Sequence, residues 1–220
     1  MKNAKVVIID SGICNLFNVQ RAFATVGADI TVTCQKADIL GASSVVLPGV
    51  GAFGPGMHAL EQHDLVDALH RFVKSGKPLL GICLGMQMLM TESEEHGRWS
   101  GLGLIRGRVR ALRQPPPGGP VYKIPHIGWS AIEPPAARTW EGTVLDGVAS
   151  GSYMYFVHSY VVDPEDTQCC LAQTSYGVDR FCSVINHESV SACQFHPERS
   201  GDAGLRLLRQ FVTAGVLAAS

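Results

Sequence analysis

The chain has 220 residues, enough to bury a substantial core in one large domain, and its 46% hydrophobic and 17% charged residues indicate a globular protein. Its formal net charge of −1 provides no basic footprint for nucleic acid or an anionic membrane, and no apolar stretch reaches the length of a membrane span. The seven cysteines include no C-x-x-C pair, which argues against a disulfide framework and against a zinc site. Because the first residues show no signal-peptide pattern, we expect one domain over residues 1–220, with reduced thiols, in the cytoplasm.

The first half of the chain alternates strand and helix patterns. Short apolar runs at 6–9, 30–33, 45–47 and 78–82 predict strands that are buried on both faces. Between them, apolar residues at helical spacing predict a helix at 16–26, stopped by Gly27, and a second helix at 57–72 that ends near Gly76. A further helix is expected at 86–90. This alternation indicates an α/β fold with an open, mostly parallel sheet and helices on both faces.

The second half of the chain consists mainly of strand patterns with short connections, at 102–112, 124–132, 153–162, 169–174, 181–185 and 190–195, before a final helix at 205–212. We therefore expect antiparallel strands added to the parallel sheet. In the strand at 102–112, alternation places Arg106, Arg108 and Arg110 on one face, opposite Ile105 and Val109. An exposed strand face is favoured over a docking stripe for an acidic partner.

Cys83 lies between two glycines at the point where the apolar strand at 78–82 turns into a helix. Gly81 and Gly85 permit a sharp, strained turn that presents the middle side chain, as in a nucleophile elbow with Cys in place of Ser. A helix that begins just beyond the sulfur favours the thiolate, which is the nucleophilic form. From this segment alone, a buried structural cysteine is the alternative interpretation.

A second segment offers a base for that nucleophile, because His196, Pro197 and Glu198 directly follow an apolar strand. In extended backbone His196 and Glu198 share a face, and Pro197 between them restricts the backbone. Sites in open α/β sheets form at the carboxyl ends of the strands, which is where both this segment and Cys83 lie. A His beside a Glu in a loop is usually a solvated pair, so the prediction of a Cys-His-Glu triad depends on the two segments together.

Acyl transfer also needs backbone donors aimed at the developing oxyanion. Gly49 and Gly51 lie in a glycine-rich loop after a strand, and the N–H of Leu84 begins the helix of the elbow. These groups are the candidate donors. A phosphate-binding loop is disfavoured, since the segment has neither G-x-x-x-x-G-K-[ST] nor G-x-G-x-x-G, but a plain turn is an alternative.

Together these motifs resemble the class I (triad) glutamine amidotransferases. The resemblance rests on G-I-C-L-G-M-Q around Cys83, P-G-V-G-A-F at 48–53 and Q-F-H-P-E at 194–198. Within that family, K-I-P-H-I-G-W at 123–129, Y-F-V-H-S-Y at 155–160 and H-P-E-R-S-G-D-A-G-L at 196–205 resemble the amidotransferase subunits of imidazole glycerol phosphate synthases. The resemblance runs from Asp10 to Phe211 and implies a flavodoxin-like fold.

The resemblance also implies roles for individual residues. Cys83 would be the nucleophile, His196 the base and Glu198 its orienter. The oxyanion hole would come from Gly49, Val50, Gly51 and Leu84, and the substrate glutamine would be held by Gln87, Glu95, His158, Ser159 and Tyr160. For Glu95 a solvated helix end at 92–95 is the alternative, and for Ser159 and Tyr160 a plain strand.

The activity implied is that of a glutaminase subunit in histidine biosynthesis. It would hydrolyse glutamine to glutamate and ammonia through a thioester on Cys83, with neither metal nor organic cofactor. The ammonia would pass through a protected channel to a (β/α)₈ cyclase subunit, with which the chain would form a heterodimer. No nucleic acid and no membrane would be involved.

The sequence departs from the family pattern at two places. Residues 10–15 read D-S-G-I-C-N where the family usually has D-Y-G-x-G-N, so that Ser11 and Cys14 replace an aromatic residue and a glycine. Ser130 stands where an Asn often follows Gly-Trp. Because the first loop belongs to the face that meets the cyclase in this family, a protein of the same type serving another ammonia acceptor, for example in surface-sugar amidation, is an alternative. A Cys-elbow hydrolase and a silent binding module are alternatives of other classes, although a silent module needs no base beside its cysteine.

Overall fold

The computed structural model describes residues 5–12, 14–115, 117–119, 121–136 and 138–218. Within these residues the strands form a seven-stranded, a four-stranded and a two-stranded sheet. The large sheet contains, in spatial order, β11 (Cys170–Tyr176), β12 (Asp179–His187), β13 (Val190–Cys193), β4 (Leu79–Cys83), β3 (Ser44–Gly49), β1 (Lys5–Ile9) and β2 (Asp29–Thr33). The strands from β13 to β2 are parallel, whereas β12 and β11 continue the sheet in antiparallel pairing. The predicted sheet, mostly parallel with antiparallel strands added late in the chain, is therefore confirmed.

The two smaller sheets come from the middle of the chain. The four-stranded sheet has the order β10 (Tyr160–Pro164), β7 (Ile105–Ala111), β5 (Met90–Ser93) and β6 (Trp99–Ser100), and the two-stranded sheet pairs β8 (His126–Ala131) with β9 (Tyr153–His158). The prediction of a single strand at 153–162 is thus wrong, because this segment forms two strands in different sheets, separated at Ser159.

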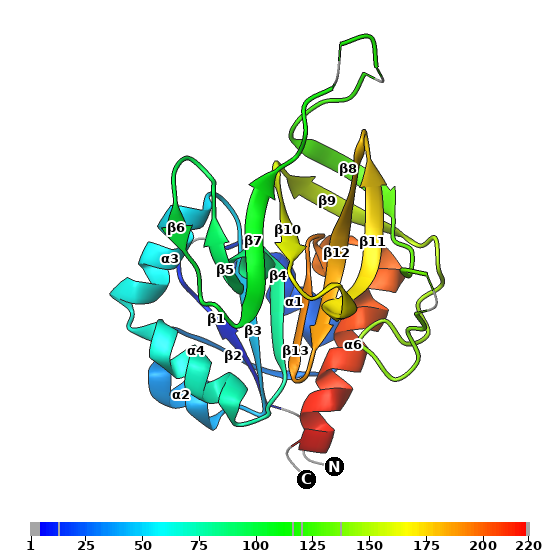
Figure 1. Ribbon diagram of the computed structural model, residues 1–220. Coiled ribbons are helices and arrows are strands. Elements are labelled where there is room, and N and C mark those ends of the chain that lie inside the picture. Colours follow the sequence, from blue (N-terminus) through cyan, green and yellow to red (C-terminus); the bar gives the residue numbers. More distant parts are fainter. Residues whose placement is uncertain (1–4, 13, 116, 120, 137, 219–220) are drawn as a thin grey trace.

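Helices cover both faces of the large sheet. They are α1 (Leu16–Thr25), α2 (Lys36–Gly41), α3 (Phe53–Gln62), α4 (Leu65–Lys74), α5 (Leu84–Met88) and α6 (Gly201–Ala218), with short 3₁₀ helices η1 (Thr167–Cys169) and η2 (Pro197–Arg199). In Figure 1, α2, α3 and α4 lie together at the left, and α6 lies at the right. None of the helices in the described residues is long and apolar enough to cross a membrane.

The strand β1 shows why the parallel strands are continuous apolar runs. Successive side chains of a strand point to opposite faces, so Val6 and Ile8 pack into the cluster that holds Phe23 of α1 and Phe211 of α6. Val7 and Ile9 pack into the other cluster, together with residues of α2, α3 and α4. Every position must be apolar because both faces are covered.

The helix predictions are wrong in three places. The helix expected at 57–72 is two helices, α3 and α4, because Asp64 takes a left-handed conformation (φ 52°) between them. The short helix α2 follows β2 and was not predicted. The helix after Cys83 ends at Met88, and Met90 already begins β5.

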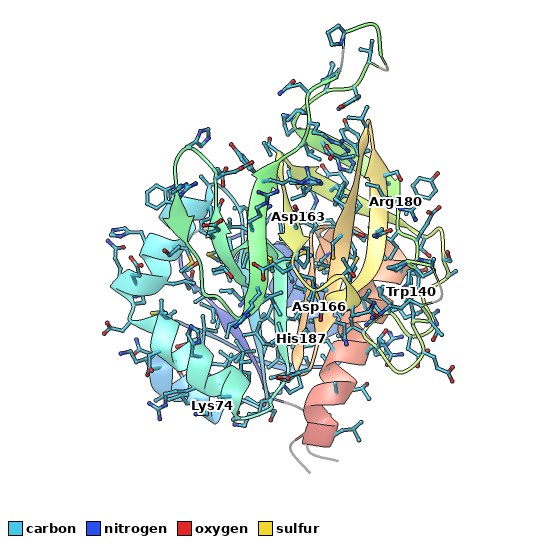
Figure 2. All side chains as sticks on the ribbon, viewed as in Figure 1. Lys74, Trp140, Asp163, Asp166, Arg180 and His187 are labelled. Carbon is cyan, nitrogen blue, oxygen red and sulfur yellow. The ribbon has the colours of Figure 1, made fainter. Side chains whose placement is uncertain are left out.

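The arginines of β7 share one face, as predicted, with Arg106 and Arg108 exposed and Arg110 half-buried, while Ile105 and Val109 are buried. Nη1 of Arg110 lies 3.0 Å from the carboxylate of the buried Asp179. Figure 2 shows Asp163 of β10 beside this strand. Its carboxylate lies 3.5 Å from Nε of Arg108 and 3.9 Å from Nε of Arg110. Carboxylates of the same chain therefore pair with part of the basic stripe, which agrees with the exposed-face interpretation.

Candidate active site

The structure confirms the sharp turn at Cys83. This residue joins β4 to α5 with φ 54° and ψ −110°, a conformation that L-amino acids rarely adopt. The flanking glycines are required by packing, because a Cβ on Gly85 would lie 1.8 Å from the carbonyl oxygen of Leu47. A Cβ on Gly81 would lie 3.0 Å from the backbone of Gly85 and of Met86. Strand β3 and helix α5 thus hold the strained turn, and the sulfur borders a cavity.

His196 and Glu198 reach this turn from the neighbouring strand. Strand β13 runs parallel to β4, and the register pairs Cys193 with Ile82, so the chain beyond β13 ends beside Cys83. Nδ1 of His196 lies 2.8 Å from Oε1 of Glu198. The backbone of His196 is fixed as well, since its N–H donates to the carbonyl of Tyr155 and its carbonyl accepts from Oγ of Ser200.

The backbone between His196 and Glu198 differs from the extended one predicted. It is extended at His196, but Pro197–Arg199 forms the 3₁₀ helix η2. The two side chains therefore meet through this turn, and the prediction that they share one face of a strand is wrong. Pro197 occupies the first position of the turn, where its fixed φ is compatible with helical backbone.

The charge state of His196 follows from its neighbours. Burial lowers the pKa of its imidazole, but hydrogen bonds and charges from Cys83 and Glu198 outweigh burial and raise the pKa from 6.5 to about 10. Imidazolium is therefore favoured between a sulfur and a carboxylate. This is the arrangement expected for a thiolate–imidazolium pair whose ring is oriented by Glu198.

A cavity of about 240 Å³ opens in front of Cys83. It is lined by Val50, Gly51, Cys83, Leu84, Gln87, Glu95, Pro125, Val157, His158, Ser159, Tyr160 and His196. The structure thus brings together at one cavity all the residues predicted to bind substrate except Gly49. Gly49 and Glu198 line a small neighbouring cavity. Pro125 and Val157 border the main cavity without having been predicted.

The glycine-rich loop follows β3 directly. Gly49 pairs with Cys83 across the two parallel strands, and a Cβ there would lie 3.0 Å from Cβ of Leu84. Gly51 has φ 97°, which favours glycine. The lack of a side chain at Gly49 lets the loop backbone approach Leu84, as a set of backbone donors requires.

Glu95 is not part of a solvated helix end. Glu95 is only 8% exposed, and its Oε2 accepts a hydrogen bond of 2.7 Å from the N–H of Phe53, at the start of α3. A carboxylate at a helix N-terminus is stabilised by the helix dipole. The contact ties the far end of the glycine-rich loop to one wall of the cavity.

The carbonyl of Tyr160 is a shared acceptor beneath the cavity. It lies 3.0 Å from Nδ1 of His158 and 3.0 Å from Nε2 of Gln87. A carbonyl can only accept, so Nδ1 of His158 carries the proton. Nε2 of His158 then accepts from Nδ1 of His126 at 3.0 Å, and Nε2 of His126 accepts from Oγ of Ser130 at 2.9 Å.

His126 and His158 are both neutral at pH 7. Burial lowers the pKa of His126 to about 4. Burial, with the nearby His126 as a second cause, lowers the pKa of His158 to about 3. The hydrogen bonds thus run in one direction, from Ser130 on β8 to the backbone beside the cavity. Neither His126 nor Ser130 was predicted as a site residue, because both reach the cavity only through His158, which is 32 positions from His126 in the sequence.

Among the described residues, no group of three or more His, Cys, Asp or Glu side chains has an arrangement that could hold a metal ion. All seven cysteines are free thiols.

The chain matches the family described as "Glutamine amidotransferase class-I" over residues 7–214. A crystal structure of a glutamine amidotransferase from Thermotoga maritima superposes with a TM-score of 0.60 at 17% identity, covering 90% of this chain and 77% of that chain. Another glutamine amidotransferase crystal structure superposes with a TM-score of 0.72 at 18% identity, covering 96% of this chain and 98% of that chain. At these identities the superpositions show a common fold. Since the family match covers nearly the whole chain, the protein belongs to the class-I glutamine amidotransferase family.

Within that family, this chain is similar to proteins that share one name. A Legionella pneumophila (strain Lens) protein named imidazole glycerol phosphate synthase subunit HisH 1 is 40% identical over 95% of this chain and 99% of its own length. Proteins named imidazole glycerol phosphate synthase subunit HisH from Syntrophotalea carbinolica and Aquifex aeolicus are 45% and 44% identical, each over 94% of this chain and over 98% and 95% of their own lengths.

Proposed function

We propose that this chain is the glutaminase subunit of an imidazole glycerol phosphate synthase and acts as one domain over residues 1–220. The observation that carries the proposal is the juxtaposition at one cavity of a strained Cys83 and the His196–Glu198 pair, whose Nδ1–Oε1 distance is 2.8 Å. The similarity to proteins named HisH, at 40–45% identity, supports the assignment of the pathway.

The reaction begins when the thiolate of Cys83 attacks the side-chain amide carbon of glutamine, forming a C–S bond and a tetrahedral oxyanion. The N–H of Leu84 and N–H groups of the 49–51 loop stabilise that oxyanion. His196 then gives its proton to the departing nitrogen, so the C–N bond breaks to leave ammonia and a glutamyl thioester. Water, deprotonated by His196, attacks the thioester and releases glutamate and the thiolate. Neither metal nor organic cofactor is needed.

The substrate's α-amino and α-carboxylate groups find complementary partners in the cavity. Glu95 supplies the negative charge for an α-ammonium group. The carbonyl of Ser159 accepts from the N–H of Leu112 in the segment after β7, so the N–H of Tyr160 in the same trans peptide points away from that segment, and both Ser159 and Tyr160 line the cavity. This N–H and the Ser159 hydroxyl are the proposed donors to the α-carboxylate.

The acceptor of ammonia is a (β/α)₈ cyclase subunit, with which the chain forms a heterodimer. Ammonia released into water is protonated and lost, so the cavity must open into a protected channel at that interface. The cytoplasm is the proposed location, where seven free thiols stay reduced.

The test is to trap the thioester from labelled glutamine in the presence of the cyclase. Cys83→Ala and Cys83→Ser should lose the thioester and at least about a thousandfold of glutamate release. The fold should be retained, because the change removes one sulfur at a cavity wall. Cys34→Ser, at a half-buried free thiol that does not line the cavity, is the control and should keep full activity. Substantial turnover by Cys83→Ala would refute the assignment of the nucleophile.

A further inference from the structure

A chain of side-chain amides joins the Tyr160 carbonyl to the sulfur of Cys83, and the reaction outlined above does not use it. Nε2 of Gln87 lies 3.0 Å from the carbonyl oxygen of Tyr160 and 3.1 Å from Oε1 of Gln194. Nε2 of Gln194 lies 3.8 Å from Sγ of Cys83. This distance suits a hydrogen bond to sulfur, whose radius exceeds that of oxygen.

The Tyr160 carbonyl fixes the donor and the acceptor of every hydrogen bond in this amide network. The Tyr160 carbonyl can only accept, so Gln87 must present its nitrogen to it. The second N–H of Gln87 needs an acceptor, so Gln194 must present its oxygen to Gln87. The NH₂ group of Gln194 is then left facing Cys83, and its orientation follows from the network.

Burial gives this arrangement energetic weight. Gln194 is 0% exposed and Gln87 5% exposed. A buried amide that loses a partner pays its desolvation cost, so neither side chain can reverse without leaving polar atoms unpaired. The backbone of Gln194 is also held, since its N–H donates to the carbonyl of Ser183.

The His196 imidazole faces the sulfur as well: burial lowers its pKa, but hydrogen bonds and charges from Cys83 and Glu198 raise it to about 10, so this group also favours the thiolate. A further polar neighbour of the sulfur has a preference opposite to that of Gln194. Sγ of Cys83 lies 3.9 Å from the carbonyl oxygen of Val157. A protonated thiol can donate to that carbonyl, whereas a thiolate cannot. The Gln194 amide donates to either form and binds the anion more strongly. The two contacts therefore oppose one another across the ionisation of Cys83.

We propose that Gln194 is a positioning residue for the nucleophile: it donates an N–H to Sγ of Cys83 and favours the thiolate, while Gln87 holds Gln194 in the donating orientation. The proposal builds on the role of Cys83 in the proposed function. It also limits what Gln87 offers to glutamine, because both of its N–H groups are used within the protein and only its Oε1 is left to face the substrate.

The test is the rate at which iodoacetamide alkylates Cys83, measured by peptide mass spectrometry across a series of pH values. Gln194→Met keeps the size of the side chain but has no donor. It should slow alkylation about tenfold at neutral pH, as expected for losing a hydrogen bond to a charged group, and move the pH profile to higher pH. Gln87→Met should have a smaller effect in the same direction. Ser44→Ala, which removes a buried hydroxyl at the amino end of β3, should match the unmodified protein.

Two further measurements separate positioning from a general loss of structure. In the complex with the cyclase, Gln194→Met should lower kcat for glutamate release and leave KM for glutamine unchanged, since Gln194 touches the sulfur and not the substrate. In the unsubstituted protein, the side-chain NH₂ resonances of Gln194 should shift when Cys83 is alkylated. Alkylation of Gln194→Met at the original rate and pH profile, or unshifted NH₂ resonances, would overturn the proposal. Because alkylation needs no glutamine, its result stands even if the glutaminase assignment fails.

Discussion

Cys83 differs from the other cysteines of the chain in both backbone and surroundings. A non-glycine residue at positive φ costs roughly 1–3 kcal/mol and persists only where the surrounding structure imposes it. Burial keeps some of the other thiols protonated: it raises the pKa of Cys193 well above its ordinary value, and burial with the nearby Asp10 raises that of Cys14 to about 11. The pKa of Cys170 is lowered, first by a hydrogen bond from Cys182, but no imidazole is among the causes. Cys83 instead has a base and an amide donor within reach of its sulfur. Cys83 thus combines a base, an amide donor and a cavity at one thiol.

His196 and Glu198 should contribute unequally to glutamate release. His196→Ala removes the base and should cost about a thousandfold or more, whereas Glu198→Gln leaves an imidazole that takes the proton in a poorer orientation and should cost less. The measurement is single-turnover thioester formation in the presence of the cyclase, with the exposed Glu141→Gln as the control. Equal and negligible losses in both variants would remove the pair from the mechanism.

The same pair should make stability depend on pH. The folded pKa of His196 is raised from 6.5 to about 10, so its stabilisation is fully present below pH 6.5 and is lost as pH rises through about 10. Glu198→Gln removes one of the charges that raise this pKa, so in that variant the stabilisation by His196 should be smaller below pH 6.5 and should be completely lost at a lower pH. Urea unfolding over that pH range should show that the gap between the free energies of unfolding of the two proteins closes as the pH rises. A gap that does not change with pH would contradict the linkage.

At the scale of the elements, the elbow depends on β3, β4 and α5 approaching closely. Gly85→Ala places a Cβ 1.8 Å from the Leu47 carbonyl, a backbone atom of the buried strand β3 that cannot move aside. We expect a loss of several kcal/mol, comparable to severe overpacking, with Cys83 displaced. Gly41→Ala, at the end of α2, meets nothing within 4 Å and should be neutral or stabilising by up to about 1 kcal/mol. Thermal unfolding of both variants checks this, and a Gly85→Ala protein as stable as the original would refute the packing argument.

Local patterns predicted the elements whose signals are local. The apolar runs and their flanking glycines predicted β1, β3, β4 and the turn at Cys83, because each depends on neighbouring residues. The break between α3 and α4 was missed because Asp64 takes its left-handed conformation without glycine or proline to announce it. Gln194 and His126 were missed for another reason. Their partners, Gln87 and His158, are 107 and 32 positions away, and only the folded sheet brings them together.

At the scale of the whole molecule, large apolar side chains remain exposed on elements close to the site. Trp129 of β8 and Tyr153 of β9 are 53% and 63% exposed, and Phe17 of α1 is 70% exposed. Strand β9 and helix α1 both pack against η2, which carries Glu198. Exposed aromatic side chains are typical of protein interfaces. We therefore expect the proposed cyclase to bind on this surface.

The glycine-rich loop links that surface to catalysis. Gly49 is fixed within β3 and the N–H of Phe53 is fixed by Glu95, so the peptide units around Val50 and Gly51 are the part of the loop with freedom to rotate. Only an orientation that presents an N–H to the cavity stabilises an oxyanion. Val50 is 41% exposed, so a partner can touch the loop and favour that orientation by population shift.

Glutamate release should accordingly be low in the isolated chain and should rise when the histidine-pathway cyclase and its nucleotide ligand are added. Trp129→Ala should weaken cyclase binding about tenfold, as loss of an aromatic interface residue does, while Cys83 alkylation in the free chain stays unchanged. Leu217→Ala, equally apolar and 73% exposed near the end of α6, should bind the cyclase normally. Titrating cyclase against each variant while following glutamate release measures both effects.

Full activity in the isolated chain would reject the proposed activation by the partner. Activation by another synthase but not by this cyclase would retain the thioester chemistry and reject the histidine pathway.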